Sequence, residues 1–159
     1  MFYVRRLFDN EIEEASRLIW LTFYKFESKG YSEEGLVNFR NFIEPVSLRM
    51  NSFDGYVVLF GAFDQGDRSK DRLVGVSGVR EKSHICLNFV DGEYHRHGIG
   101  RELFNEMYEF AKTDANINEM TVNSSDYGMA FYEAMGFEKA GERMVRDGIV
   151  YTPYRLGLK

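Results

Sequence analysis

The sequence has 159 residues, 44% of them hydrophobic and 16% aromatic, so it holds enough apolar material for one compact domain covering residues 1–159. A formal net charge of -5 argues against a general nucleic-acid binder, because such proteins need a basic face for phosphates. The single cysteine, Cys86, excludes an intrachain disulfide and suits a reducing compartment, and no apolar run approaches the ~20 residues of a membrane span. We therefore expect a cytoplasmic protein without a membrane or nucleic-acid partner.

The N-terminal region predicts one strand and two helices. The apolar and β-branched segment 2–8 is typical of a strand, and Asp9 or Asn10 is placed to cap a helix with an apolar stripe. Ser32 is expected to open a second amphipathic helix, which Pro45 ends.

The middle of the chain predicts an antiparallel meander followed by a helix. Segments 56–63, 72–80 and 84–90 are strand-like, with the turn-rich DQGDRSKD joining the first two and EKS the next. After Gly98 the apolar period changes to that of a helix, which we expect to run to about Asp114.

The C-terminal region predicts a strand, a short helix and a closing hairpin. Segment 119–123 should lie parallel to strand 84–90, because a long helix connects them. A short helix at 127–135 precedes two strand-like runs separated by RDG. The expected sections of the domain are residues 1–50 (the first strand and substrate-side helices), 55–115 (meander and loop-helix) and 119–159.

Two closely spaced glycines, Gly98 and Gly100, lie between an apolar strand and a helix, which is the arrangement of an anion site. Arg96 and Arg101 add positive charge to the free amides of the helix start. The dinucleotide fingerprint fails, because its third glycine would fall on Leu103, and no Gly-Lys-Ser/Thr triplet occurs. By itself, the same pattern also fits a plain strand-to-helix turn.

Two motifs give this chain a family resemblance. HRHGIG at residues 95–100 matches the pattern Gln/Arg-x-x-Gly-x-Gly/Ala, with His95 at the first position. VNSSDYGMAFYEAMGF at residues 122–137 matches an Asn/Ser-rich strand end followed by Phe-Tyr-x-x-x-Gly-Phe. In both motifs, and in the order of its elements, the chain resembles the GNAT superfamily of N-acetyltransferases. The resemblance implies an α/β (α+β) fold with a mixed, mostly antiparallel sheet of about seven strands, about four flanking helices, and parallel fourth and fifth strands that splay apart.

The resemblance also implies acetyl-CoA as the cofactor. Its pantetheine arm is expected to bond to the backbone near Phe89 and Val90, with Asn123 and Ser125 opposite. The diphosphate is then expected on the glycine loop, formed by His95, Arg96, His97, Gly98, Ile99, Gly100 and Arg101.

For catalysis, the resemblance implies that Tyr132 protonates the leaving thiolate, although its helical spacing also fits a core aromatic residue. His84, Glu81 or a chain of waters could serve as the general base. Asn88 interrupts an apolar strand, and it either marks a bulge beside the thioester or faces solvent.

The acceptor is expected to be a primary amine, with a small molecule preferred to a protein tail. Glu27, Glu33 and Glu34 could attract such a cation, or they could form the solvated, acidic start of a helix. The closing strands could also pair across a homodimer.

Three other functions fit parts of the sequence less well. A zinc site at His84, Cys86, His95 and His97 is disfavoured because the two pairs lie at opposite ends of one strand. A Cys86 nucleophile is disfavoured because the residue lies in an apolar run. We therefore expect neither a metal site nor catalysis by the thiol. The main alternative is a GNAT-fold module that binds an acyl-CoA as a sensor or interaction domain without turning it over.

Overall fold

An eight-stranded mixed sheet runs through the computed structural model, which describes residues 1–66 and 69–159. The strand order is β1-β2-β3-β4-β5-β8-β6, and β7 pairs with β8 outside this path. Only the β4–β5 pair is parallel among the described strands, as the long connecting helix predicts. The strands are β1 (Phe2–Arg6), β2 (Val57–Asp64), β3 (Arg72–Arg80), β4 (His84–Val90), β5 (Glu119–Ser124), β6 (Glu138–Lys139), β7 (Met144–Arg146) and β8 (Ile149–Gly157).

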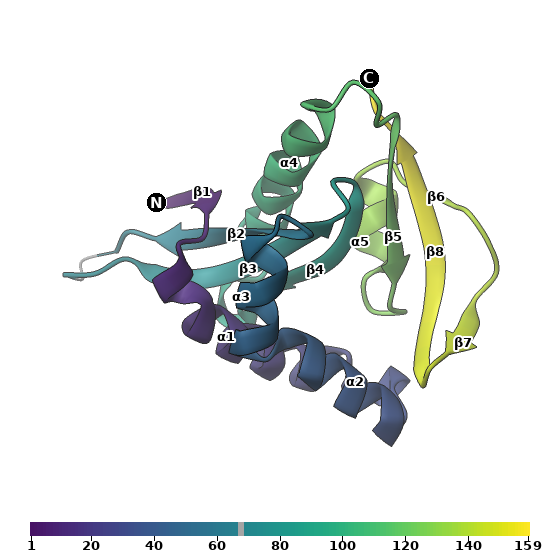
Figure 1. Cartoon of the computed structure of the whole chain (residues 1–159), viewed down its shortest axis with the longest axis horizontal. Helices are drawn as coiled ribbons and strands as arrows, with labels where there is room; N and C mark the ends of the chain where they lie inside the picture. The colour runs from purple at the N-terminus through teal and green to yellow at the C-terminus, as the bar shows by residue number, and fades with distance from the viewer. Residues whose placement is uncertain (67–68) are drawn as a thin grey trace.

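Helices cover both faces of this sheet. Figure 1 shows α4 on one face and α1, α2 and α3 on the other, with α5 beside β5. The sheet between these layers is therefore buried on both sides, which explains the long apolar runs in β2 and β3. The α-helices of the described residues are α1 (Ile12–Phe26), α2 (Glu33–Ile43), α3 (Pro45–Phe53), α4 (Ile99–Lys112) and α5 (Met129–Ala134).

The sheet and its helices confirm the GNAT fold expected from the sequence, with two differences in detail. The closing segment forms two short strands, β6 and β7, where one was expected, and both pair with β8. A helix not expected from the sequence, α3, starts at Pro45 directly after α2 ends. Proline ends a helix but is also well suited to the first turn of the next, since that turn needs no N–H donor there.

The starts of α1 and α2 can be compared with the capping residues expected from the sequence. The Ser32 side chain accepts a hydrogen bond from the Gly35 amide at 3.2 Å and caps α2 as predicted. The helix expected from Asp9 or Asn10 instead begins with a turn of 3-10 helix, and α1 starts at Ile12. The predicted turn DQGDRSKD between β2 and β3 includes residues 67–68, which lie outside the described residues.

The parallel strands β4 and β5 separate soon after they meet. Only two residue pairs join them, His84 with Thr121 and Ile85 with Val122. In the β3–β4 ladder, Gly78 pairs with Leu87 and Val79 with Ile85, so Cys86 forms a bulge. The rest of β4 therefore has a free edge on the β5 side, which confirms the expected splay.

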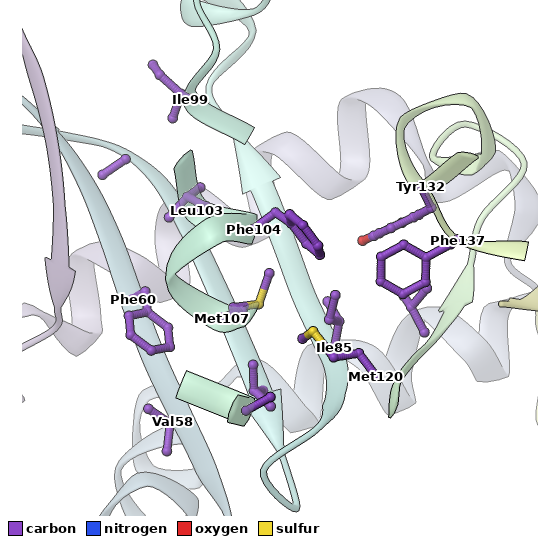
Figure 2. Close-up of a cluster of buried hydrophobic side chains, with 14 of the residues drawn as sticks. Val58, Phe60, Ile85, Ile99, Leu103, Phe104, Met107, Met120, Tyr132 and Phe137 are labelled. Carbon is purple, nitrogen blue, oxygen red and sulfur yellow. The ribbon is translucent and has the colours of Figure 1, made fainter. Parts of the chain in front are cut away.

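Two apolar cores lie on opposite faces of the sheet. One joins α1, α2 and α3 to the sheet. The other, drawn in Figure 2, joins α4 to the sheet and to Tyr132 and Phe137 around α5. Figure 2 also shows the Tyr132 ring extending from α5 towards β4, which carries Ile85. Tyr132 is thus held by the core on the side where β4 and β5 diverge.

The β7–β8 turn docks on the start of α2, as Figure 1 shows at the lower end of β8. Its Gly148 carbonyl accepts a hydrogen bond from the Ser32 amide at 2.8 Å. Gly148 has φ +80°, and a Cβ there would collide with the Ser32 hydroxyl and the Gly35 backbone. This contact fixes the turn that carries Arg146 against the N-terminal helices.

Gly148→Ala is expected to destabilise the protein more than Gly55→Ala, by at least about 1 kcal/mol of unfolding free energy. Both glycines have left-handed backbones, at φ +80° and +81°, which cost alanine about 1 to 2 kcal/mol each. Gly55 has no atom within 4 Å of the added Cβ, so it is the matched control for strain alone. Denaturant unfolding of the two variants measures the difference, and equal losses would show that the docking contact is not tight.

Candidate active site

Three adjoining cavities follow the gap between β4 and β5. The loop cavity, about 330 Å³, lies at the glycine loop and is lined by Asn88, Val90, Tyr94, His95, Arg96, Gly98, Ile99, Gly100, Arg101, Tyr127, Phe131 and Met135. The central cavity, about 170 Å³, is lined by the free part of β4, the end of β5, α5, Glu27, Tyr31, Phe39 and the start of β8. The loop and central cavities share Asn88, Tyr127 and Phe131, so they meet where Asn88 projects from β4.

The third cavity, which we name the arginine cavity, lies beyond the central one and has a volume of about 340 Å³. It continues from the central cavity, with which it shares Tyr31, Phe39, Ile85, Cys86, Asn123, Ile149 and Tyr151. The residues that distinguish it are polar or charged apart from Phe42, namely Asn38, Arg80, His84, Arg146 and Asp147.

The glycine loop has the backbone of an anion site. Gly98 is the N-cap residue of α4 with φ +80°, and Arg96 also has a left-handed φ of 67°. The Glu102 amide already donates to the Gly98 carbonyl at 3.1 Å, so the amides of Ile99, Gly100 and Arg101 are those without intrahelical acceptors. Seven of the predicted cofactor residues therefore line one cavity: Val90, His95, Arg96, Gly98, Ile99, Gly100 and Arg101.

The two loop histidines take different positions. His95 Nε2 lies 2.7 Å from the Val90 carbonyl oxygen, and because a carbonyl only accepts, this nitrogen carries the hydrogen. The His95 ring also packs on Phe26, with centroids 4.9 Å apart. His97 is not among the residues lining the loop cavity, and its ring packs edge-on against Phe2 at 5.9 Å. His95 thus ties the loop to the end of β4, while His97 contacts β1.

Tyr132 lies in the wall of the central cavity with only 7% of its surface exposed. Burial raises the pKa of its phenol, and the Glu27 charge adds to this, while a hydrogen bond with Asn88 acts in the opposite direction. A hydrogen bond that lowers a phenol pKa is one donated to its oxygen, so the Asn88 amide is the donor. The Tyr132 hydroxyl is therefore protonated at neutral pH, and the residue lines the central cavity.

Asn88 has an unusual position between two cavities. Its Oδ1 atom is buried without a hydrogen-bond partner among the described residues. It lines both the loop and the central cavities, two residues after the bulge at Cys86. Asn88 therefore faces the gap rather than bulk solvent, and it leaves one buried acceptor available for a ligand amide.

Glu27 is the acid that the sequence did not distinguish from its neighbours. It directly follows α1, and its half-buried carboxyl lines the central cavity, whereas Glu33 and Glu34 are exposed in the first turn of α2. Burial raises the pKa of Glu27, and a hydrogen bond with Ser125 counteracts this in part. A lone acid between two helices carries no sequence signal, because only the fold brings it opposite the end of β5.

Ser125, Asn123 and Phe89 also line the central cavity, as expected from the second motif and from β4. The Ser125 hydroxyl accepts a hydrogen bond from the Gly128 amide at 3.1 Å and interacts with Glu27. Asn123 is exposed at the boundary with the arginine cavity.

His84 and Cys86 both lie on β4, where His84 lines the arginine cavity and Cys86 lines both that cavity and the central one. Burial and the Arg80 charge lower the pKa of His84 to about 4, and its Nδ1 lies 2.8 Å from the Thr121 hydroxyl. Burial raises the pKa of the Cys86 thiol to about 12, so the nucleophilic thiolate does not form near neutral pH. His84 is likewise a weak proton acceptor at neutral pH. Glu81, the other candidate base, is exposed in the β3–β4 turn.

Comparison with known protein families identifies the family of this chain. Residues 27–158 match the family described as the acetyltransferase (GNAT) domain. The chain belongs to the GNAT acetyltransferase family. This match contains the glycine loop, Tyr132 and Glu27, and so confirms the family that the two motifs indicated.

Sequence relatives and solved structures agree with this family. The human protein N-acetyltransferase 8 is 31% identical over 86 residues, 46% of this chain and 37% of that protein. The chain spans only 25% of the length of another curated relative, from Mycobacterium leprae. A GCN5-related N-acetyltransferase from Rhodopseudomonas palustris has the same fold, with TM-score 0.79, 17% identity, and coverage of 98% of this GNAT chain and 95% of that one.

One structural relative contains coenzyme A. The PaiA N-acetyltransferase from Thermoplasma acidophilum, solved in complex with coenzyme A, matches with TM-score 0.78 and 18% identity over 99% of both chains. Two features of this GNAT domain leave polar groups available in the cavities: the free edge of β4, and the buried Oδ1 of Asn88, which has no partner among the described residues. A Cβ at Gly100 would lie 3.1 Å from the Phe131 ring, so glycine lets that ring pack closely against the start of α4.

The described part of the chain has no helix long and apolar enough to span a bilayer.

Proposed function

We propose that this protein transfers an acetyl group from acetyl-CoA to a primary amine of a small molecule, by direct attack while both are bound. The observation that carries the proposal is the position of Tyr132, a buried and protonated phenol in the wall of the cavity that also contains Glu27 and adjoins the glycine loop. A proton donor on one side of a bound thioester and a carboxylate on the other are the groups that acyl transfer to an amine needs.

In this proposal the glycine loop and β4 hold the cofactor. The amides of Ile99, Gly100 and Arg101 bind the diphosphate, with Arg96 nearby for charge. The free edge of β4 donates and accepts hydrogen bonds with the amides of the pantetheine arm, and the Asn88 side-chain oxygen accepts one from a pantetheine N–H. When bound, acetyl-CoA supplies an activated acetyl group as its thioester.

The proton transfers are assigned to two side chains. Glu27, whose raised pKa makes it a stronger base than an exposed carboxylate, takes the proton from the acceptor ammonium group. The free amine attacks the carbonyl carbon, forming a C–N bond as the C–S bond breaks. Tyr132 donates its proton to the departing sulfur, and the amide nitrogen loses its second amine proton, by way of solvent, to the resulting Tyr132 phenolate. Glu27 releases the ammonium proton to solvent. Glu27 replaces His84 in this role, because the low pKa of His84 leaves it with little affinity for a proton.

Calorimetry and a thiol-release assay with purified protein test the proposal. Acetyl-CoA should bind, and free CoA should appear only when an amine from a broad panel is present. Arg101→Gln should weaken acetyl-CoA binding about tenfold, because a charge-assisted contact to phosphate is lost, while the exposed Arg155→Gln on β8 should have no effect.

Two outcomes would overturn the proposal in different ways. Tight acetyl-CoA binding with no turnover across the amine panel would favour a sensor or interaction module. Absence of acetyl-CoA binding would contradict both the cofactor and the reaction.

A further inference from the structure

The arginine cavity carries more positive charge than the proposed acetyl transfer requires. Arg80 and Arg146 line it together with His84, and Asp147 is the acidic residue in its wall. Asp147 lies at the exposed β7–β8 turn with φ 53°, beside Gly148 at φ 80°, so its place is set by the tight turn. The cavity therefore has two cationic side chains against one carboxylate.

Arg80 is the less usual of these residues. Its Nε atom is buried without a hydrogen-bond partner among the described residues. Within the same part of the chain, Arg5, Arg49, Arg72 and Arg143 each pair with a carboxylate, whereas no ion pair involves Arg80 or Arg146. Burying part of a guanidinium group without a hydrogen-bond partner costs free energy, which a bound anion would offset.

The positive charge of Arg80 reaches the shared wall of the two cavities. It lowers the pKa of His84 and opposes the effect of burial on the pKa of Cys86. Because its pKa is low, His84 is neutral near pH 7. It can therefore donate or accept a hydrogen bond in the arginine cavity but adds no positive charge there.

The spacing along β4 sets the length of a ligand that could reach both cavities. Arg80 pairs with His84 at the start of β4, and Asn88, which lines the central cavity with Glu27, lies four residues further on. At a rise of about 3.3 Å per residue, these backbone positions are roughly 13 Å apart, and the Arg80 side chain covers part of that distance. An α-amino acid, with its charges on adjacent carbons, is too short, while a chain of several carbons fits.

We propose that the acceptor carries an anionic group several carbons from its amine, and that Arg80 and Arg146 bind this anion in the arginine cavity. The amine then lies in the central cavity at Glu27, and the aromatic rings of Tyr31, Phe39 and Tyr151 pack on the spacer. The arginine cavity, at about 340 Å³, has the size of a small-molecule site. This inference rests on the proposed function, because it assigns the acceptor of that reaction.

The test compares acceptors of matched length. Pentylamine, 5-aminopentanoate and 4-aminobutylphosphonate differ in the distal group, and glycine serves as the short anionic amine. For the wild type, kcat/KM for at least one of the two long anionic acceptors should exceed that for pentylamine by about tenfold or more, since a charged hydrogen bond contributes that much. Preference between carboxylate and phosphonate identifies the anion.

Variants locate the anion site. Arg80→Gln and the exposed Arg146→Gln should each reduce the ratio of kcat/KM for the preferred anionic acceptor over pentylamine, and Arg80→Lys should restore part of it. Arg155→Gln, an equal change of charge on the exposed side of β8, should leave the ratio as in the wild type. If Arg80→Gln does not fold, Arg146→Gln and Arg80→Lys still carry the test.

A binding measurement separates failure of this inference from failure of the proposed function. Calorimetric titration of 5-aminopentanoate and 4-aminobutylphosphonate into the CoA-loaded protein needs no turnover, and at least one should bind with an affinity that Arg146→Gln weakens. Binding of this kind without acetylation of any amine would contradict the proposed reaction but support the anion site. Acetylation of pentylamine with equal efficiency, or a preference that persists in Arg80→Gln and Arg146→Gln, would overturn the anion site while leaving the reaction in place.

Discussion

Tyr132→Phe is expected to lower kcat about 100-fold or more while changing the acetyl-CoA dissociation constant only a few-fold. The substitution removes one oxygen and keeps the ring that packs edge-on against Phe131 and Phe137. The leaving sulfur then loses its proton donor, which matters in the transition state and not in cofactor binding. Steady-state kinetics and calorimetry on the same preparation measure both quantities.

Tyr154→Phe is the matched control for this variant. Tyr154 is also buried, at 1% exposure, but its hydroxyl donates to Glu133 at 2.6 Å outside the three cavities. Loss of this hydroxyl in Tyr154→Phe should lower the stability of the protein but leave kcat unchanged. If Tyr132→Phe lowers kcat and acetyl-CoA affinity to the same extent, Tyr132 is a binding residue and its role as the acid is wrong.

Glu27→Gln is expected to lower kcat about 100-fold at neutral pH, because the amide keeps the shape of the side chain but cannot take a proton. The change should also alter the pH profile. Burial raises the pKa of Glu27 above its ordinary value, so wild-type kcat at saturating acceptor should rise with pH through that raised pKa as the carboxyl loses its proton. In Glu27→Gln this rise should disappear.

The profile also distinguishes Glu27 from His84. A base at His84 would place the acid limb near pH 4, where that side chain titrates. Glu33→Gln, at an exposed acid in the first turn of α2, is the control and should keep the wild-type profile. Retention of the acid limb in Glu27→Gln, or a greater loss of kcat in His84→Gln, would assign the proton acceptor elsewhere.

Much of the fold could be predicted from the sequence because its elements are strongly patterned. The bounds of β3 and β4 agree with the predicted 72–80 and 84–90, and α4 starts at the predicted Ile99. Continuous apolar runs and a long amphipathic stripe give these signals locally. The helix α3 was missed because Pro45 is equally compatible with the end of one helix and the first turn of another.

Some residues of the candidate site could likewise be predicted from the sequence, and others could not. The glycine loop and Tyr132 were predicted because each depends on residues close together in the sequence, and the structure places them on adjoining cavities. The loop histidines were predicted as a group, but only His95 lines the loop cavity, since the left-handed backbone at Arg96 turns the chain between them. Glu27 and Arg80 gave no local signal that set them apart.

The sequence by itself determined the family, most of the strand and helix order, and the position of the glycine loop, because these depend on short-range periodicity, on glycines before a helix and on two compact motifs. Only the tertiary structure decided which ionisable groups share a cavity. It brings Glu27 from the end of α1 to Ser125 after β5, and it places Arg80 of β3 and Arg146 of β7 on the wall of one cavity. The raised pKa of Glu27 and the shared wall of Arg80 and Arg146 depend on burial and on neighbours distant in the chain, which no local pattern encodes.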